Sequence, residues 1–542
     1  MADNEISDNE VADLDHSTPM AAPTSTTSPS SPPRSPSTSP LPLPLESSSS
    51  TSLPPAYIPT QEQKNAYRWP NAELIATNNI FAFPKHTIDP RTQYPTKRIT
   101  IACDNVKFVQ CWDSSLSGPI LQYLTAIPNS WRFDILRLGF AEADTTTLPI
   151  VLHLFIGLRS EDPVVSDGLA LQIVQDVASM ISRNWQGESV YIDVCKPRLR
   201  GFSEILDILA PLQLQLSGKD FSNIPAGYYA RNPPFPSSSV GQDDSTGQKC
   251  TSGTLSGYVK HEHDLYLFTP LHVLHGGFGS LVESPSPIDH QKAKEALQQN
   301  IGPLLPRSVV EKVFDSLLRF LSRLPLFSDF WLKIWNDSKK WNPKLGTVTY
   351  HSTRKEVNAF DWCLTKLEGL EESQNYNRHV PYNIHDRSSG FRHPPVKGFS
   401  PADVDLAKIY FAPGPAFKPI RTTFLANNEI CLKPPSRTTR EWTIGSVNSI
   451  RTYTQSQPGG VLYTLYCIIC TTTGDVFSRN GDSGAIVLDK NFQPVAMVQS
   501  GDDAVNGNPD ITHAVDLPSL LANVEEVNGW AQGSAVFCSG GV

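Results

Sequence analysis

The residues most capable of chemistry lie near the C-terminal end of the chain, in the stretch Gly481-Asp482-Ser483-Gly484. A serine that follows a turn and has small neighbours can attack a substrate carbonyl that approaches close to the backbone. Its hydroxyl is a poor nucleophile at neutral pH, so a base must take the proton and a third group must orient that base. Because Gly-Asp-Ser-Gly also occurs as an ordinary turn, the assignment depends on partners elsewhere in the chain.

Two further positions offer the base and its partner. His272 follows the apolar run 265–269, which predicts a strand, and a histidine just past a strand end can be held by the sheet while it faces a cleft. His275, three positions further on, is an alternative base. Asp361 stands at the start of another strand-like run, and the order His272, Asp361, Ser483 supplies all three roles.

The elements that would position these residues are short strands from about residue 250 onward. Alternating and β-branched runs predict strands at 253–260, 265–269, 346–350, 360–367, 441–444, 461–469, 485–488, 495–498 and 511–515, with a closing helix at 518–525. Two blocks of such strands predict an all-β double antiparallel barrel. Helical periodicity at about 285–345 predicts an insertion whose apolar stripes serve packing rather than a cofactor.

The first 237 residues differ in composition from the rest. Residues 1–64 begin acidic and are rich in Ser, Pro and Thr, so they bury too little surface to offset chain entropy, and we expect a disordered tail. Residues 65–237 alternate strand-like runs with a helix whose apolar face runs from Leu169 to Ile181, which predicts a small α/β (α+β) domain. Its role is open, and a protein partner could bind there.

Composition argues against several classes of function. The chain has 542 residues, too many for one core, and its net charge of −9 does not favour nucleic-acid binding. It has no apolar run of about 18 residues and no signal-like N-terminus, so we expect an intracellular, cytoplasmic protein without membrane contact. The 9 cysteines are odd in number and scattered, which does not imply a disulfide framework.

Two local patterns could suggest a metal site. Cys467-Ile-Ile-Cys470 has a spacing found in zinc sites, but residues three apart in a strand face opposite sides of the sheet, and no second pair follows. His261-Glu-His263-Asp264 could hold a metal, yet a polar hairpin turn explains it equally well. We therefore predict no metal and no cofactor.

The region from about 250 to 530 resembles the trypsin-like (chymotrypsin-fold) serine proteases, particularly fungal proteins in which such a fold follows a small α/β domain. The resemblance rests on Thr269-Pro-Leu-His272-Val-Leu, Phe360-Asp361-Trp-Cys-Leu and Gly481-Asp-Ser483-Gly, in the family's order. It implies that His272 is the general base, Asp361 its orienting partner and Ser483 the nucleophile. It further implies an oxyanion hole formed by the backbone N–H groups of Gly481 and Ser483.

The resemblance also implies substrate-binding positions. Phe477 stands where the family reads the substrate side chain, and because no acid is there to pair with Arg or Lys, we expect a preference for small or apolar side chains. Gln499, Ser500 and Gly501 match the segment that would pair with the substrate backbone. Asp482 would support a buried donor or charge, and no activation cleavage site is evident.

We therefore predict a multidomain serine endopeptidase that hydrolyses polypeptides through an acyl-enzyme. Its expected parts are a tail (1–64), an α/β domain (65–237), a trypsin-like domain (238–530) with the helical insertion, and a C-terminal tail (531–542). One alternative is a catalytically weak or inactive protease-fold protein that serves as a binding or scaffold module. Another is an esterase that acts on small acyl groups with the same serine.

Overall fold

The structure is a computed structural model that describes residues 53–67, 72–80, 97–102, 105–140, 150–158, 165–197, 238–243, 250–274, 278–284, 286–287, 289, 344–352, 360–367, 420–434, 436–439, 443–455, 458–470, 476–479, 481–502 and 511–538. All of these residues belong to one compact unit, Thr51–Val542. Most of the predicted tail, nearly all of the predicted helical insertion and the alternative base His275 lie outside the described residues.

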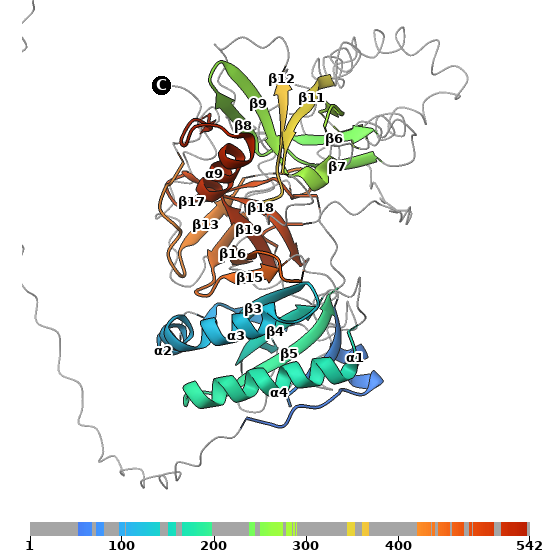
Figure 1. The fold of residues 1–542 in the computed structure, drawn as a ribbon, viewed down its shortest axis with the longest axis vertical. Helices are drawn as coiled ribbons and strands as arrows, with labels where there is room; N and C mark the ends of the chain where they lie inside the picture. Colours follow the sequence, from blue (N-terminus) through green and yellow to red (C-terminus); the bar gives the residue numbers. More distant parts are fainter. Residues whose placement is uncertain are drawn as a thin grey trace, which may run out of the picture. The chain divides into compact units, whose positions relative to one another are not determined.

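The N-terminal part is a sheet with helices on one face (Figure 1). Its strands are β1 (Ala72–Thr77), β5 (Val190–Pro197), β4 (Val151–Leu158), β3 (Trp131–Phe140) and β2 (Lys97–Thr100), paired in that order. Its helices are α1 (Gln61–Tyr67), α2 (Val106–Cys111), η3 (Trp112–Leu116), α3 (Ser117–Thr125) and α4 (Asp167–Asn184). Strands β4 and β5 are parallel because α4 connects them, and the apolar face of α4 packs into the core. The predicted α/β class of this part is confirmed.

The described part of the chain begins before the predicted end of the tail. Tyr57 exchanges backbone hydrogen bonds with Thr77 of β1 at 2.8 and 3.0 Å, and its hydroxyl donates to the carbonyl of Asn79 at 3.0 Å. Leu53 and Ala56 pack against the same core. A composition average over residues 1–64 conceals these few residues, which gain their stability from a distant strand.

The second barrel is closed and contains six antiparallel strands. Around the barrel they are β13 (Ile430–Lys433), β14 (Thr443–Val447), β16 (Leu462–Cys470), β19 (Ile511–Asp516), β18 (Pro494–Asp502) and β17 (Ile486–Asp489), which pairs with β13 again. Helix α9 (Leu517–Asn528) follows, capped by the Asp516 carboxylate at its start and by Gly529 in the left-handed region at its end.

The first barrel is a half-barrel sheet. Its order is β20 (Val536–Phe537), β8 (Gly257–His261), β9 (Asp264–Thr269), β12 (Cys363–Leu367), β11 (Lys344–His351), β10 (Leu281–Glu283), β6 (Ser239–Asp243) and β7 (Cys250–Thr254). Strand β20 belongs to the predicted C-terminal tail, so that segment is in part a paired edge strand with a buried Phe537. The Trp362 indole donates to the Asn523 side chain of α9 at 2.9 Å, which ties this sheet to the closing helix. The predicted all-β double-barrel class is confirmed.

The α/β sheet and the second barrel are joined edge to edge. Strand β15 (Thr452–Gln455) pairs with β3 on one side and with β16 on the other, which makes one continuous sheet. The Asn448 side chain accepts from the N–H of Ala102 at 2.9 Å and donates to the carbonyls of Ile135 and Ile450 at 2.8 and 2.7 Å. In the described part of the chain, no helix is both long and apolar enough to cross a membrane.

Candidate active site

His272 and Asp361 meet because their strands are neighbours. His272 lies in the single turn η5 (Leu271–Val273) directly after β9, and Asp361 lies just before β12. These strands are antiparallel, with Thr269 opposite Cys363, so the end of one adjoins the start of the other. The hydrogen-bond register of two neighbouring strands therefore brings together residues that are far apart in sequence.

Ser483 comes to the same place from the second barrel. It lies in the turn before β17, and its backbone carbonyl accepts from the N–H of Thr254 in β7 at 2.9 Å. Its Oγ lies 2.7 Å from Nε2 of His272, while Nδ1 of His272 is hydrogen-bonded to Oδ2 of Asp361. The histidine ring thus lies between the carboxylate and the hydroxyl.

The Asp361 carboxylate is held in its ionised form. Burial would raise the pKa of Asp361, but the neighbouring His272 charge and hydrogen bonds from the His272 ring, the His272 backbone N–H at 3.1 Å and the Leu271 backbone outweigh it and lower that pKa. An ionised carboxylate selects the tautomer in which Nδ1 of His272 carries the proton. Nε2 is then free to accept the Ser483 proton.

The Ser483 hydroxyl has a second acceptor nearby. Its Oγ lies 2.8 Å from the backbone carbonyl of Gln499, at a register shift in β18 between Val498 and Ser500. A hydroxyl donates only one proton, so the carbonyl receives it when Nε2 of His272 is protonated. The two acceptors define a resting and a reactive orientation of the same hydroxyl.

The turn around Gly481 depends on glycine. Gly481 has φ +97°, and a Cβ there would meet the Arg437 guanidinium at 2.3 Å and the Thr438 hydroxyl at 2.4 Å. Its carbonyl accepts from the Thr254 hydroxyl at 2.9 Å. Within the described ranges, the backbone N–H groups of Gly481 and Ser483 donate no hydrogen bond to the protein. An oxyanion hole would use two backbone donors of this kind beside Ser483.

Asp482 is a buried support, as expected from the sequence. Its carboxylate lies 3.5 Å from the ammonium of Lys433, and both side chains are fully buried. Asp482 also accepts from the N–H groups of Thr438, Thr439 and Arg479, each at 3.0 Å. Burial raises the pKa of Asp482, yet Lys433 and the surrounding donors lower it below its usual value. Lys433 supplies the buried positive charge from within the chain.

A second buried pair braces the same turn. The Arg437 guanidinium binds both carboxylate oxygens of Asp289, at 2.5 and 3.0 Å, and Asp289 also accepts from the hydroxyls of Ser239 and Ser286. Thr254 connects this pair to the turn that contains Gly481 and Ser483. Its hydroxyl accepts from the Arg437 backbone N–H at 3.4 Å and donates to the Gly481 carbonyl. Sequence reasoning missed Lys433, Arg437, Asp289 and Thr254, since no short motif marks them.

Phe477 lies inside the second barrel. It is fully buried, its ring faces Gly445, and its carbonyl accepts from the Thr443 hydroxyl at 2.7 Å. The next residue, Ser478, is hydrogen-bonded to Thr512 at 2.5 Å, and both are fully buried. Phe477 therefore belongs to the core of the barrel, and these three buried positions carry no charge.

Gln499, Ser500 and Gly501 lie together on β18, beside the nucleophile. All three are partly exposed, and Ser500 and Gly501 pair with His513 and Thr512 of β19. The Gln499 carbonyl contacts Ser483, so this strand runs along the site.

Comparisons with known proteins found solved structures of low similarity. No protein-family model and no curated protein matches the sequence. Thermobifida fusca Protease A is 13% identical and covers 54% of this chain and 95% of its own, with a TM-score of 0.28. Nocardiopsis protease is 11% identical and covers 55% of this chain and 95% of its own, with a TM-score of 0.27. The Rv3671c protease from M. tuberculosis is 16% identical and covers 56% of this chain and 87% of its own, with a TM-score of 0.25. At these values the fold class rests on the strand order described above.

Proposed function

We propose that this chain is a serine endopeptidase that hydrolyses polypeptides with Ser483, His272 and Asp361. The observation that carries the proposal is the His272 ring, which contacts the Asp361 carboxylate through Nδ1 and lies 2.7 Å from the Ser483 hydroxyl through Nε2. This arrangement provides a nucleophile, a base and an orienting group in one hydrogen-bonded line. The proposed protease part spans residues 238–530, with the α/β part at 65–237.

The proposed reaction has two halves. Ser483 Oγ attacks the peptide carbonyl while Nε2 of His272 takes its proton, and the carbonyl oxygen becomes an anion facing the N–H groups of Gly481 and Ser483. The imidazolium then gives the proton to the leaving amine, which departs and leaves an acyl group on Ser483. Water attacks this ester with His272 again as the base, and the acid product leaves. No cofactor enters any step.

The proposed substrate preference follows from the sequence position six residues before Ser483. Phe477 stands there and offers no carboxylate to pair with Arg or Lys, which favours small or apolar side chains. Gln499 to Gly501 would add the substrate backbone to β18 as an extra strand. A peptide-library digest should show cleavage after small or apolar residues, and a strict preference for Arg or Lys would contradict this part of the proposal.

An active-site-directed fluorophosphonate probe tests the nucleophile directly. We expect labelling of the wild-type chain, loss of labelling in Ser483→Ala, and normal labelling in Ser182→Ala, a control at an exposed serine of helix α4. Equal labelling of the wild type and Ser483→Ala would show that Ser483 is not the nucleophile. No labelling of folded wild type would favour the alternative in which the fold serves as a binding or scaffold module, and labelling with turnover of small esters only would favour an esterase.

A further inference from the structure

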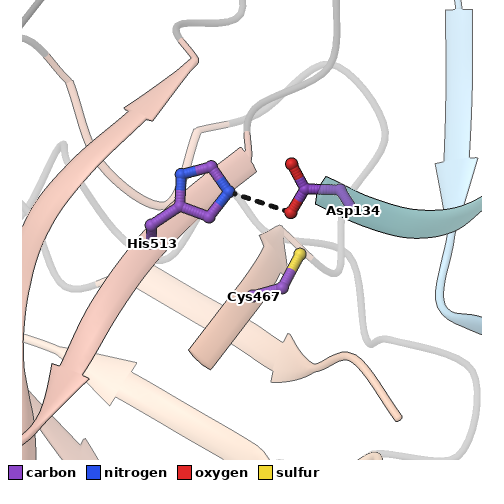
Figure 2. Close-up of side chains that lie close together, drawn as sticks. All are labelled: Asp134, Cys467 and His513. Carbon is purple, nitrogen blue, oxygen red and sulfur yellow. Dashed lines mark hydrogen bonds and ion pairs between the residues drawn. The ribbon is translucent and has the colours of Figure 1, made fainter. Parts of the chain in front are cut away.

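Three potential metal ligands of different chemistry converge where the α/β sheet packs against the second barrel. They are Asp134 of β3, Cys467 of β16 and His513 of β19, and one donor atom of each lies within 4.8 Å of the other two. Figure 2 shows the Cys467 thiol directed toward the space beside the His513 ring nitrogen and the Asp134 carboxylate. All three side chains are buried, with at most 1% exposed. We propose that they bind a zinc ion, which joins the two parts of the chain.

The separations fit a shared metal better than a direct ion pair. Nε2 of His513 lies 3.2 Å from Oδ1 of Asp134. Charge-assisted N–H···O bonds are about 2.7–2.9 Å long, and the His153–Asp193 pair of the same sheet has 2.7 Å. Two N or O ligands of a tetrahedral zinc ion lie about 3.3 Å apart. A thiolate ligand would lie about 3.5 Å from the others. The present separations are at most 4.8 Å, so the Cys467 sulfur would need to move inward by roughly 1.3 Å at most.

The donor set selects the kind of ion. Calcium and magnesium prefer oxygen ligands throughout, whereas a thiolate, an imidazole nitrogen and one carboxylate oxygen suit zinc. Three protein ligands leave a fourth tetrahedral position, which a water molecule can fill. Binding would convert the Cys467 thiol to a thiolate with release of one proton to solvent.

Neighbouring side chains hold the Asp134 carboxylate in position. Oδ2 of Asp134 lies 3.1 Å from Nε of Arg132, and Oδ1 accepts from the Thr452 hydroxyl of β15. Hydrogen bonds of this kind orient ligating carboxylates and tune their basicity. Oδ1 of Asp134, the oxygen that faces His513, would be the metal ligand and would keep the Thr452 hydroxyl as its hydrogen-bond donor. The Arg132 charge offsets part of the negative charge that the carboxylate and the thiolate bring together.

The structure also explains why Cys467 and Cys470 do not form a metal-binding pair despite their zinc-like spacing. Cys467 packs in the cluster between the α/β sheet and the barrel, whereas Cys470 packs in the barrel interior. The two cysteines therefore face opposite sides of the sheet, as a strand requires. The partners of Cys467 come instead from residues 134 and 513, and only the folded chain brings them close.

Metal content of the full chain, purified without chelator, tests the proposal independently of any activity. We expect about one zinc ion per chain by inductively coupled plasma mass spectrometry. We also expect the melting temperature to fall by about 5 °C or more when a chelator removes the zinc. Cys467→Ala should lose most of the zinc, while Cys470→Ala, a matched control on the same strand, should keep it. Cobalt added to the apo chain should give a thiolate-to-cobalt absorption band in the wild type and in Cys470→Ala, but not in Cys467→Ala.

The outcomes separate the proposal from a simple buried ion pair. Folded wild type that binds neither zinc nor cobalt would overturn the metal site and leave a His513–Asp134 pair beside a thiol. A cobalt band that persists in Cys467→Ala would overturn the ligand assignment. If Cys467→Ala does not fold, the wild-type cobalt spectrum and the zinc content of His513→Gln decide the question.

Discussion

Replacing Lys433 by Met should destabilise the second barrel substantially. The Lys433 ammonium is fully buried 3.5 Å from the Asp482 carboxylate, so the variant leaves that carboxylate without its positive partner. Removing one member of a buried ion pair costs about 3–5 kcal/mol. Because three backbone N–H groups still bind Asp482, we expect a value near the lower end, about 3 kcal/mol. Asp482 directly precedes Ser483, so its unpaired buried charge should also slow probe labelling.

The pH dependence of the stability loss in Lys433→Met shows whether the unpaired Asp482 charge causes it. Burial raises the pKa of Asp482, and Lys433 is the first of the groups that bring it below its usual value. In the wild type the ionised carboxylate therefore contributes stability at neutral pH, and this contribution is lost as the pH falls through the lowered pKa. Without Lys433 the pKa of Asp482 should rise, and protonation then relieves the unpaired charge. The destabilisation of Lys433→Met should accordingly shrink as the pH falls below neutral.

Urea unfolding followed by tryptophan fluorescence at pH 7 and at lower pH measures both effects. Lys366→Met is the matched control, because Lys366 pairs with Asp264 at 2.7 Å with both side chains nearly half exposed. Such a surface pair contributes at most about 1 kcal/mol. The double variant Lys433→Met/Asp482→Asn should regain part of the loss. The reasoning fails if Lys433→Met costs no more than Lys366→Met, or if its cost is independent of pH.

Three further substitutions test other contacts. Thr254→Val removes the hydroxyl that holds the Gly481 carbonyl, and kcat should fall about tenfold with little change in KM in a peptide-cleavage assay. Gly481→Ala places a methyl group against Arg437 at φ +97°, and thermal unfolding should show a loss of about 1–3 kcal/mol together with loss of probe labelling. Asn448→Ala leaves the Ala102 N–H and two carbonyls without their partner. It should cost about 3 kcal/mol, seen as faster hydrogen exchange in β3.

Much of the double barrel could be predicted because strand signals are local. The predicted strand 461–469 is β16 (Leu462–Cys470), and 485–488 is β17 (Ile486–Asp489). β15 (Thr452–Gln455) went unpredicted because its Thr-Tyr-Thr-Gln sequence has little apolar alternation. It forms because β3 and β16 supply hydrogen bonds on both sides. Pairing with distant strands can thus form a strand that no local sequence pattern predicts.

The candidate triad could also be predicted from local sequence signals. The buried residues that support it, such as Lys433, could not. His272, Asp361 and Ser483 each stand in a short motif next to a strand, so residue type and order identify them. Lys433 ends an apolar strand and looks like an ordinary boundary residue, although it is fully buried. Only the closing of the barrel places it beside Asp482 and removes both from water, which turns an ordinary lysine into a support for the nucleophile turn.

The position of the α/β sheet limits what that part of the chain can bind. One face is covered by its own helices, which contribute to the core cluster around Trp112 and Phe133. The other face contributes Leu136 and Phe155 to a cluster shared with Ile511 of the barrel. Both faces of the sheet are therefore used within the chain, and β3 is also committed to β15 at its edge. Among the described residues, the outer surface of the helices remains for a protein partner of this part of the chain. Removal of this part would expose apolar surface on the barrel strands themselves.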